Sequence, residues 1–255
     1  MKEKTYHTAF NTEMIEAAKT AILPGDPGRV EKIAGYLDFP KKVTQNREYT
    51  SYLGYIDDRP VLVMSTGMGG PSAAIGVEEL HMCGVEKIIR IGSCGGMQDN
   101  VRAGDIVIAQ AAVRQDGTSR EYAPIELPAV ADFDITTALR AAAEENGYNY
   151  HIGTVQCKDS FYGQHSPEAS PVYYELKQKW ESWKRLGVKA SEMESAALFV
   201  VAAALGCRCG SCFHVIWNQE REKAGLDQDM SEDTSAAVKV AVEALKLVIE
   251  RDRKG

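Results

Sequence analysis

Short apolar runs alternate with amphipathic stretches along most of the chain. Six apolar runs are typical of buried strands, at residues 20–24, 60–66, 87–92, 105–113, 151–157 and 210–217. Helical periodicity is found between them, near residues 26–36, 70–83, 134–147, 172–184 and 192–205. Strands and helices that alternate in this way predict an α/β fold with a mixed central sheet.

The last part of the chain has one apolar helical face, formed by Val238, Val242, Leu245 and Ile249. We expect this segment to form an amphipathic helix that closes the fold. No Ser- or Gly-rich linker, internal repeat or low-complexity segment divides the 255 residues. The pattern therefore predicts a single domain over residues 1–255.

Charge and hydropathy narrow the classes of partner. The net charge of −7 and the pI near 5.4 argue against a general nucleic-acid binder, because phosphate neutralisation needs a basic surface. The first ten residues lack the apolar segment of a signal peptide, and no apolar span of 18 residues occurs. We therefore expect a cytoplasmic protein that binds neither nucleic acid nor membrane.

The cysteines do not have the paired spacing of a zinc ribbon. They are Cys83, Cys94, Cys157, Cys207, Cys209 and Cys212. Cys209 and Cys212 form a C-x-x-C, but it lies within the apolar run CRCGSCFHVIW. A buried strand with free thiols is favoured over a redox or metal site, and we expect no required metal.

Ligands of α/β sheets bind at the carboxyl ends of strands, so the residues after each predicted strand are of interest. In ILPGDPGRVEKIA, Gly25 lies in a tight turn and Arg29 opens a helix, a combination suited to phosphate. The alternative is an ordinary strand-to-helix turn, with Asp26 as the N-cap and Pro27 at the first helical position. The two readings are compatible.

A second strand end, IIRIGSCGG, places Arg90 inside an otherwise apolar strand and Ser93 shortly after it. A buried arginine is costly unless an anion pairs with it. A structural salt bridge is the alternative, but two arginine-plus-glycine strand ends in one sheet favour a shared oxyanion. A third strand end, MSTGMGGPSAAIGVEEL, either lines the same pocket or only packs tightly.

Two carboxylates, Glu192 and Glu194, lie at the start of an apolar helical segment in KASEMESAALFVVAAALG. They could simply favour the helix dipole. They could also accept the two vicinal hydroxyls of a ribose. Residues two apart diverge on a helix, so both reach one ligand only if Glu192 is still extended. We expect Glu194 to be the main hydroxyl acceptor.

Taken together, LPGDPGRVEKIA, STGMGGPSAAI, RIGSCGG, VRAGDIVI and EMESAAL resemble, in order and spacing, the bacterial uridine phosphorylases of the hexameric nucleoside phosphorylase family. The similarity runs from about His7 to the final helix. It implies a single α/β domain whose mixed sheet forms a distorted barrel flanked by helices. It also implies phosphorolysis of uridine, with deoxyuridine and thymidine as further substrates, to uracil and ribose 1-phosphate in pyrimidine salvage.

The resemblance assigns residues to three parts of a site. The implied phosphate ligands are Gly25, Arg29, Arg90 and Ser93, with Arg47 entering from a neighbouring subunit. The implied ribose ligands are Glu192, Met193 and Glu194, with His7 of a neighbouring subunit near the 5′-hydroxyl. The implied base contacts are Cys94, Gly95, Phe161 and Gln164, with Lys158, His165 and Asn218 as further candidates.

The resemblance further implies a homo-oligomer, a hexamer built as a trimer of dimers, with shared active sites. Inorganic phosphate would be the co-substrate, and no cofactor is implied. In some members a monovalent cation such as K⁺ lies between subunits, at positions matched here by Glu48, Met68 and Ser72.

The stretch QCKDSFYGQHSP departs from the family pattern. Common bacterial members have Gln-x-Arg here, whereas this chain keeps Gln164 but has Ser166 in place of the arginine. A second arginine usually follows the asparagine at position 218, where this chain has Gln219. A donor must still stabilise the base carbonyl oxygen that gains negative charge. The available substitutes are Lys158, His165, Gln219 and Arg221, although Lys158 could instead pair with Asp159.

Three alternatives remain open. Purine nucleoside phosphorylases of the same fold carry an aspartate at the position of Asn218, and its absence weakens that assignment. A nucleosidase would use water and an acidic residue where this chain has Arg29, Arg47 and Arg90. A non-catalytic nucleoside-binding protein would be expected to lose part of the phosphate set, and none of it is lost.

Overall fold

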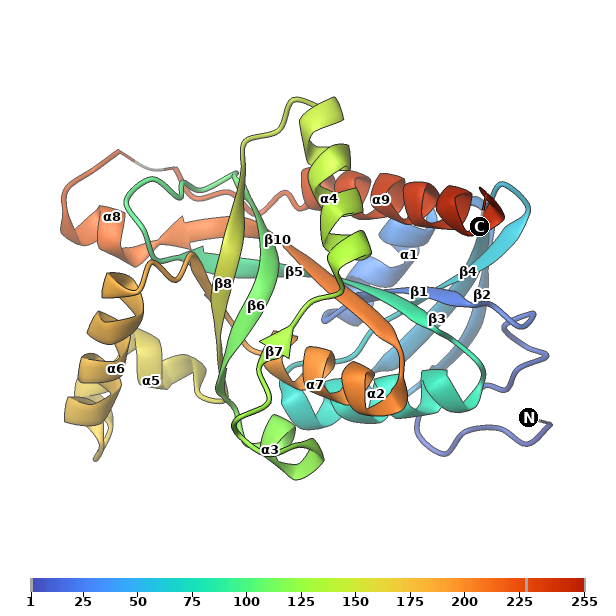
Figure 1. Cartoon of the computed structure of the whole chain (residues 1–255), viewed down its shortest axis with the longest axis horizontal. Helices are drawn as coiled ribbons and strands as arrows, with labels where there is room; N and C mark the ends of the chain where they lie inside the picture. The colour runs from blue at the N-terminus through green and yellow to red at the C-terminus, as the bar shows by residue number, and fades with distance from the viewer. Residues whose placement is uncertain (1, 228, 255) are drawn as a thin grey trace.

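A mixed β-sheet runs through the centre of the computed structural model, which describes residues 2–227 and 229–254 (Figure 1). Its strands are β1 (Thr20–Pro24), β2 (Asp38–Asn46), β3 (Tyr49–Ile56), β4 (Arg59–Met64), β5 (Lys87–Gly96), β6 (Ile106–Gln115), β7 (Ala129–Val130), β8 (Tyr150–Lys158), β9 (Ala190–Glu192) and β10 (Arg208–Asn218). Strands β10, β6, β8, β9 and β5 pair in that order, and β10 pairs with β5 to close the ring. The predicted α/β fold with a mixed, barrel-like sheet is confirmed.

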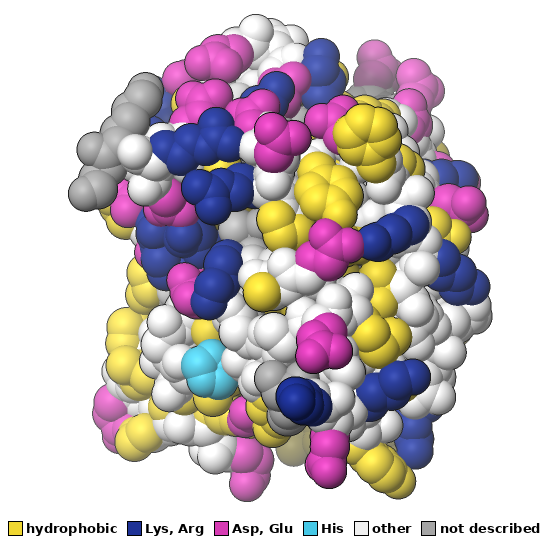
Figure 2. Space-filling model, turned by 90° about the vertical axis from the view of Figure 1, so that its right-hand side faces the viewer, with side chains coloured by type: hydrophobic (Ala, Val, Ile, Leu, Met, Phe, Trp, Pro, Cys, Tyr) yellow, Lys and Arg dark blue, Asp and Glu magenta, His cyan; other side chains and the backbone are white. Residues whose placement is uncertain are grey.

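The remaining strands extend the sheet beyond the barrel in the order β5-β1-β4-β3-β2. β1 runs parallel to both β4 and β5, whereas the β2–β3 and β3–β4 pairs are antiparallel. β2 is the edge strand, and its exposed Lys41 and Lys42 discourage further strand addition. Figure 2 shows this end of the molecule, where basic, acidic and hydrophobic side chains are interspersed.

Helices cover both faces of the sheet (Figure 1). They are α1 (Val30–Ala34), α2 (Gly70–Met82), α3 (Thr118–Tyr122), α4 (Phe133–Glu145), α5 (Phe161–His165), α6 (Tyr173–Arg185), α7 (Ser195–Leu205), α8 (Gln219–Lys223) and α9 (Ser235–Lys254). α4 and α9 lie on one side, α2 and α7 on the other, and α5, α6 and α8 gather at the left of Figure 1. Among helices within the described residues, none has the length and apolarity needed to cross a membrane.

The apolar strand runs are continuous because both faces of the sheet are covered. Ile22 of β1 packs in the core that includes α4 and α9, and the next residue, Leu23, packs in the core that includes α2 and α7. Cys209 and Cys212 of β10 are likewise buried in these two cores as free thiols. The predicted buried strand with free thiols is therefore confirmed, and burial raises the pKa of Cys212 to about 12.

Several boundaries differ from the prediction, each for a physical reason. β2 was missed because it is a largely exposed edge strand without an apolar run. The segment after residue 92 is not a loop, because it continues β5 to Gly96 and pairs with β9 and β10. α7 begins at Ser195 rather than near residue 192, since the Glu192 carboxylate accepts hydrogen bonds from the backbone N–H groups of Glu194 and Ser195.

Candidate active site

A cavity of about 740 Å³, called here the main cavity, lies where β1, β5, β8, β9 and β10 end. It is lined by most of the residues that the sequence singled out, namely Gly25, Arg29, Arg90, Ser93, Cys94, Gly95, Lys158, Phe161, Gln164, His165, Glu192, Met193 and Glu194. Gly92 of the second strand end and Gly67 of the third also line it, so the third strand end contributes to the same pocket. The sequence did not indicate the further lining residues Ser191, Ile216, Trp217 and Met230. Ser191 had a usable signal, since it directly precedes Glu192, but the three-residue strand β9 is too short to recognise from its pattern.

A buried ion pair between Arg90 and Glu194 lies at the centre of this lining. Arg90 is 4% exposed and Glu194 is 5% exposed, and a guanidinium nitrogen lies 2.5 Å from the carboxylate. The other carboxylate oxygen accepts a 2.7 Å hydrogen bond from the backbone N–H of Gly69. The structural salt bridge considered from the sequence is therefore present. Both side chains also face the main cavity, so the pair can serve a ligand as well.

The turn after β1 brings a second guanidinium to the cavity. Asp26 caps this turn by accepting a 2.8 Å hydrogen bond from the backbone N–H of Gly28, with Pro27 in the first turn, as predicted. Arg29 follows with its side chain 27% exposed. A Cβ atom at Gly25 would lie 3.3 Å from each terminal nitrogen of Arg90, so glycine is needed for this close approach. The cavity end near Gly25 thus has two guanidinium groups, one paired with Glu194 and the other 3.9 Å from the Asp26 carboxylate.

Glu192 is extended in β9, which is the condition for both carboxylates to reach one ligand. It is 4% exposed, and its carboxylate is held by backbone N–H groups at the start of α7. Burial, and then the charge of Glu194, raise the pKa of Glu192 to about 7. The Glu192 carboxyl is therefore protonated more readily than that of an exposed glutamate.

The other end of the cavity holds a chain of polar side chains. The Lys158 ammonium, 6% exposed, donates a 2.6 Å hydrogen bond to Ser191 Oγ, which donates at 2.8 Å to Gln164 Oε1. The considered pairing of Lys158 with Asp159 is wrong, because Asp159 accepts from the backbone N–H of Gly117 instead. The rings of Phe161 and His165 lie 4.3 Å apart at the rim.

Asn218 does not line the main cavity, which corrects its assignment as a base contact. Its side chain is fully buried, donates to the carbonyl oxygens of Gln98 and Val101, and accepts from N–H groups at the start of α8. Arg221 is also removed from the candidate substitutes, because its guanidinium donates to the carbonyls of Asp99 and Asp227. Both side chains hold the segment after β10 in place.

Gln219 lies just behind the polar chain. It is 8% exposed, and its Oε1 is 3.4 Å from Gln164 Nε2. Among the residues that the structure describes, it stands outside the lining of the main cavity. Gln219 thus supports Gln164 from behind.

His7 and Arg47 lie together outside the lining of the main cavity of their own chain, although Glu48, next to Arg47, belongs to that lining. The His7 ring is 2.8 Å from the Glu79 carboxylate, and Asn46 donates to the His7 carbonyl oxygen. Arg47 is exposed and lies over the ring of Tyr6, at 5.8 Å. Residues that are assigned to a neighbour's site are therefore gathered at one place.

The three candidate cation ligands are only partly gathered. Glu48 and Met68 line the main cavity, and Ser72 Oγ lies 2.9 Å from a Glu48 carboxylate oxygen. Within residues 2–227 and 229–254, no group of three or more His, Cys, Asp or Glu side chains is arranged to hold a metal ion.

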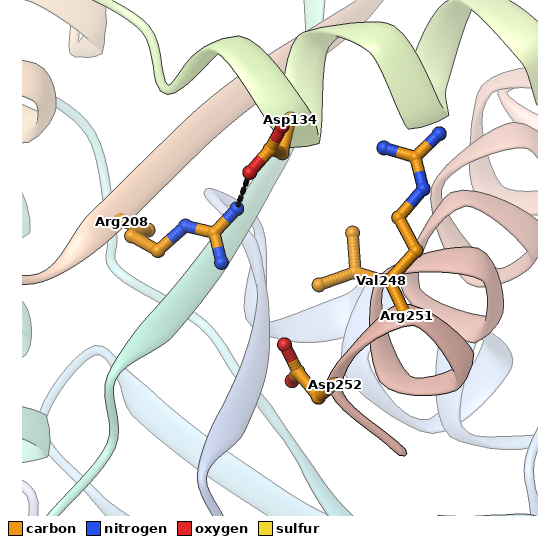
Figure 3. A pocket seen from close by; sticks show the side chains of 5 residues that line it. All are labelled: Asp134, Arg208, Val248, Arg251 and Asp252. Atoms are coloured by element: carbon orange, nitrogen blue, oxygen red, sulfur yellow. Dashed lines mark hydrogen bonds and ion pairs between the residues drawn. The ribbon is translucent and has the colours of Figure 1, made fainter. Parts of the chain in front are cut away.

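A second cavity, of about 360 Å³, lies between the start of α4, the start of β10 and the end of α9 (Figure 3). Arg208 forms ion pairs there with Asp132 and Asp134, and Asp252 pairs with Lys87. The three aspartates are thus paired with cations, and the exposed Arg251 also lines this cavity, which contains none of the site residues that the sequence predicted.

The strand ends of the α/β barrel surround one cavity, with arginines at one end and an amide at the other. This arrangement is typical of enzymes that bind an anion together with a polar small molecule. The chain belongs to the phosphorylase superfamily, whose family model matches residues 19–251. It is 54% identical to a uridine phosphorylase of Treponema pallidum over 91% of this chain and 90% of that protein. It is 40% identical to a uridine phosphorylase of Escherichia coli over 97% of this chain and 99% of that protein. It is also 38% identical to a guanosine phosphorylase of Halorubrum lacusprofundi over 87% of this chain and 89% of that protein.

The raised pKa of Glu192 predicts a specific dependence of stability on pH. The folded form binds this proton more tightly than the unfolded form, so the stabilisation is present below about pH 4.5 and is lost as pH rises through about 7. Relative to Glu192→Gln, the free energy of unfolding of the wild type should fall by up to about 3 kcal/mol across this range. Urea denaturation of both proteins at several pH values measures the difference. A difference that stays constant with pH would contradict the raised pKa.

The buried hydrogen bonds of Asn218 predict a structural role. Asn218→Ala should lower the free energy of unfolding by about 2 kcal/mol or more, because it removes a helix cap and leaves two carbonyls unpaired. Asn218→Asp keeps the cap acceptor but turns a carboxylate oxygen toward the same two buried carbonyls, so it should lose at least as much and shows that the donors are required. Denaturant titration measures stability, and the KM for the nucleoside should change little. A large rise in KM without loss of stability would return Asn218 to the binding site.

Proposed function

We propose that this protein cleaves uridine with inorganic phosphate to give uracil and ribose 1-phosphate, in cytoplasmic pyrimidine nucleoside salvage. The observation that carries the proposal is the main cavity, where Arg29 and Arg90 converge beside Gly25 at one end and Gln164 and Lys158 lie at the other. Such a cavity suits an anion and a heterocyclic base held apart by a sugar. The similarity to uridine phosphorylases over nearly the whole chain supports the same reaction.

The proposed mechanism depends on positioning and charge. Phosphate bound by Arg29, Arg90 and Ser93 lies beneath C1′ of the ribose, whose hydroxyls are accepted by Glu194. As the C1′–N bond stretches, its electron pair moves into the base and positive charge grows on the sugar. A phosphate oxygen stabilises that charge and then bonds to C1′, so no covalent protein intermediate is needed.

The ribose also offers a reason for the buried Arg90–Glu194 pair. A guanidinium has five N–H donors, and Arg90 uses few of them in the described structure. It can therefore hold Glu194 and a phosphate oxygen at the same time. In this proposal one residue links the anion to the sugar ligand and fixes their separation.

A purine nucleoside is the second candidate substrate, because the chain is also similar to a guanosine phosphorylase. Deoxyuridine and thymidine are further pyrimidine candidates. Uridine, thymidine, inosine and adenosine, each assayed with and without phosphate, separate these alternatives. Turnover without phosphate would identify a nucleosidase, and binding without turnover would identify a non-catalytic nucleoside-binding protein.

We further propose that residues 1–255 form one domain and that the active protein is a homo-hexamer, built as a trimer of dimers. His7 and Arg47 lie together outside their own main cavity, which supports a role in a neighbour's site.

No cofactor is proposed beyond phosphate as co-substrate. Glu48 and Ser72 lie close enough for a K⁺ ion at a subunit interface to be tested by activity in sodium and potassium buffers.

Phosphate dependence is the first test of the proposed function. Arg90→Ala should lower kcat/KM for uridine by about 100-fold or more, close to 3 kcal/mol of transition-state stabilisation, because a charged donor is lost from a dry site. Arg140→Ala, which removes an exposed arginine of α4, is the charge-matched control and should retain full activity. Uracil release can be followed by its absorbance at varied phosphate. Equal turnover in phosphate-free buffer would reject the phosphorylase proposal.

Shared sites predict complementation between inactive subunits. Arg47→Ala and Glu194→Ala should each be inactive alone, whereas co-expressed mixtures should recover up to roughly a quarter of wild-type activity. The reason is that one of the two sites in each mixed dimer contains neither substitution. Two differently tagged chains allow mixed oligomers to be purified before assay. No recovery in purified mixed oligomers would place Arg47 outside the neighbour's site.

A further inference from the structure

A buried lysine in the main cavity is not explained by the fold. Lys158 ends β8, is 6% exposed and lines the cavity, and its ammonium lies 2.6 Å from Oγ of Ser191, another lining residue. Within residues 2–227 and 229–254 its only side-chain hydrogen bond goes to the Ser191 hydroxyl, and no carboxylate forms an ion pair with it. An ammonium has three donors, and a buried cation without an anionic partner is costly. The cavity therefore holds a cation that a ligand could satisfy.

The direction of the adjoining hydrogen bonds follows from the lysine. An ammonium can only donate, so Ser191 Oγ must accept from Lys158 and donate its own hydrogen onward. The recipient is Gln164 at 2.8 Å, which must turn its Oε1 toward Ser191. Its Nε2 then points away, 3.4 Å from Gln219 Oε1, which can accept one of its two hydrogens, and close to Gly95, where a Cβ atom would lie 3.9 Å from it. Lys158 thus orients Gln164 through Ser191, and both residues present N–H donors to the cavity.

His165, the other cation considered for this role, is poorly suited to it. Partial burial and the charge of Lys158 lower the pKa of His165, so its ring is neutral at neutral pH. The ring instead packs against Phe161 at 4.3 Å and lies 6.4 Å from Trp217. His165 belongs to an aromatic wall, and Lys158 is the charged donor at this end.

We propose that Lys158 is the residue that stabilises the departing base, by donating a hydrogen bond to the base carbonyl oxygen that becomes negative as the C1′–N bond breaks. Ser191 is a positioning residue that holds Gln164 as a second donor. This inference rests on the proposed phosphorolysis and adds to it the group that recognises the base. The bond's electron pair is delocalised onto the carbonyl oxygen, phosphate supplies the new pair to C1′, and the released base anion takes its proton from water.

Two donors at the base edge also specify the class of base. A carbonyl oxygen can accept from Lys158, whereas an exocyclic amino group offers only donors to the same place. The site therefore favours oxo bases such as uracil and thymine over amino bases such as cytosine. Burial lowers the pKa of Lys158, and the charge of Glu192 partly offsets this effect. The ammonium is therefore a more acidic donor, and its hydrogen bond to the base oxygen strengthens as that oxygen becomes negative.

The test compares two leaving groups in the Lys158→Met variant. We expect kcat/KM for uridine to fall by about 100-fold to 1,000-fold with little change in the KM for phosphate. The loss should be several-fold smaller for 5-fluorouridine, because fluorine already stabilises the base anion. Lys158→Arg should restore part of the activity. Lys246→Met, which removes an exposed charge on α9, is the matched control and should behave as wild type.

A binding measurement separates this inference from the proposed function. Ionisation shifts the absorption of 5-fluorouracil, so a spectrophotometric titration reports the pKa of the bound base without turnover. Wild type should lower that pKa, and Lys158→Met should not. A wild type that does not cleave uridine with phosphate would reject the proposed function alone. If inosine is then found to be the substrate, the same titration with hypoxanthine tests whether Lys158 lowers the pKa of the bound base. Equal losses on uridine and 5-fluorouridine, with no difference in bound-base pKa, would overturn the role of Lys158.

Discussion

The ion pair between Arg90 and Glu194 links the two halves of the candidate site. Arg90 comes from the middle of β5, and Glu194 from the junction of β9 with α7, more than 100 residues later in the chain. A buried guanidinium and a buried carboxylate each require the other, since either alone would remain uncompensated in a medium of low dielectric. The pair therefore holds the anion end and the sugar-binding carboxylate at a defined separation. Gly25 and Gly69 complete it, one by close approach and the other by donating its backbone N–H.

Closure of the barrel is what brings these groups together. The pairing of β10 with β5 places the ends of β5, β8, β9 and β10 around one cavity, although they are distant in sequence. The charges are distributed along it: guanidinium groups at one end, carboxylates in the middle and an ammonium with amides at the other end. Burial, and then the charge of the neighbouring Glu194, raise the pKa of Glu192 to about 7. A ligand with a phosphate, a diol and an oxo base matches the three parts in order.

Much of this arrangement could be predicted from residues that violate a local pattern. Arg90 is a charge in an apolar strand, and Glu192 and Glu194 are carboxylates before an apolar helix, so each indicates a site without structural information. Most buried strands and the long helices follow from periodicity, although the largely buried strand β3 was missed. The edge strand β2 and the short strand β9 do not follow from it, because their register depends on neighbours rather than on their own side chains. For the same reason Ser191 was missed, and Asn218 was assigned to the base although tertiary contacts turn its amide toward Gln98 and Val101.

The central claim is that phosphate, ribose and base occupy the three parts of one cavity in that order. A crystal structure with inorganic phosphate and pseudouridine tests it most directly, because the carbon–carbon bond from the sugar to this base cannot be cleaved by phosphate. The account predicts a phosphate oxygen within hydrogen-bond distance of Arg90, ribose hydroxyls on Glu194, and a base carbonyl oxygen on Lys158. Phosphate bound away from Arg90, or a base turned away from Lys158 and Gln164, would contradict it.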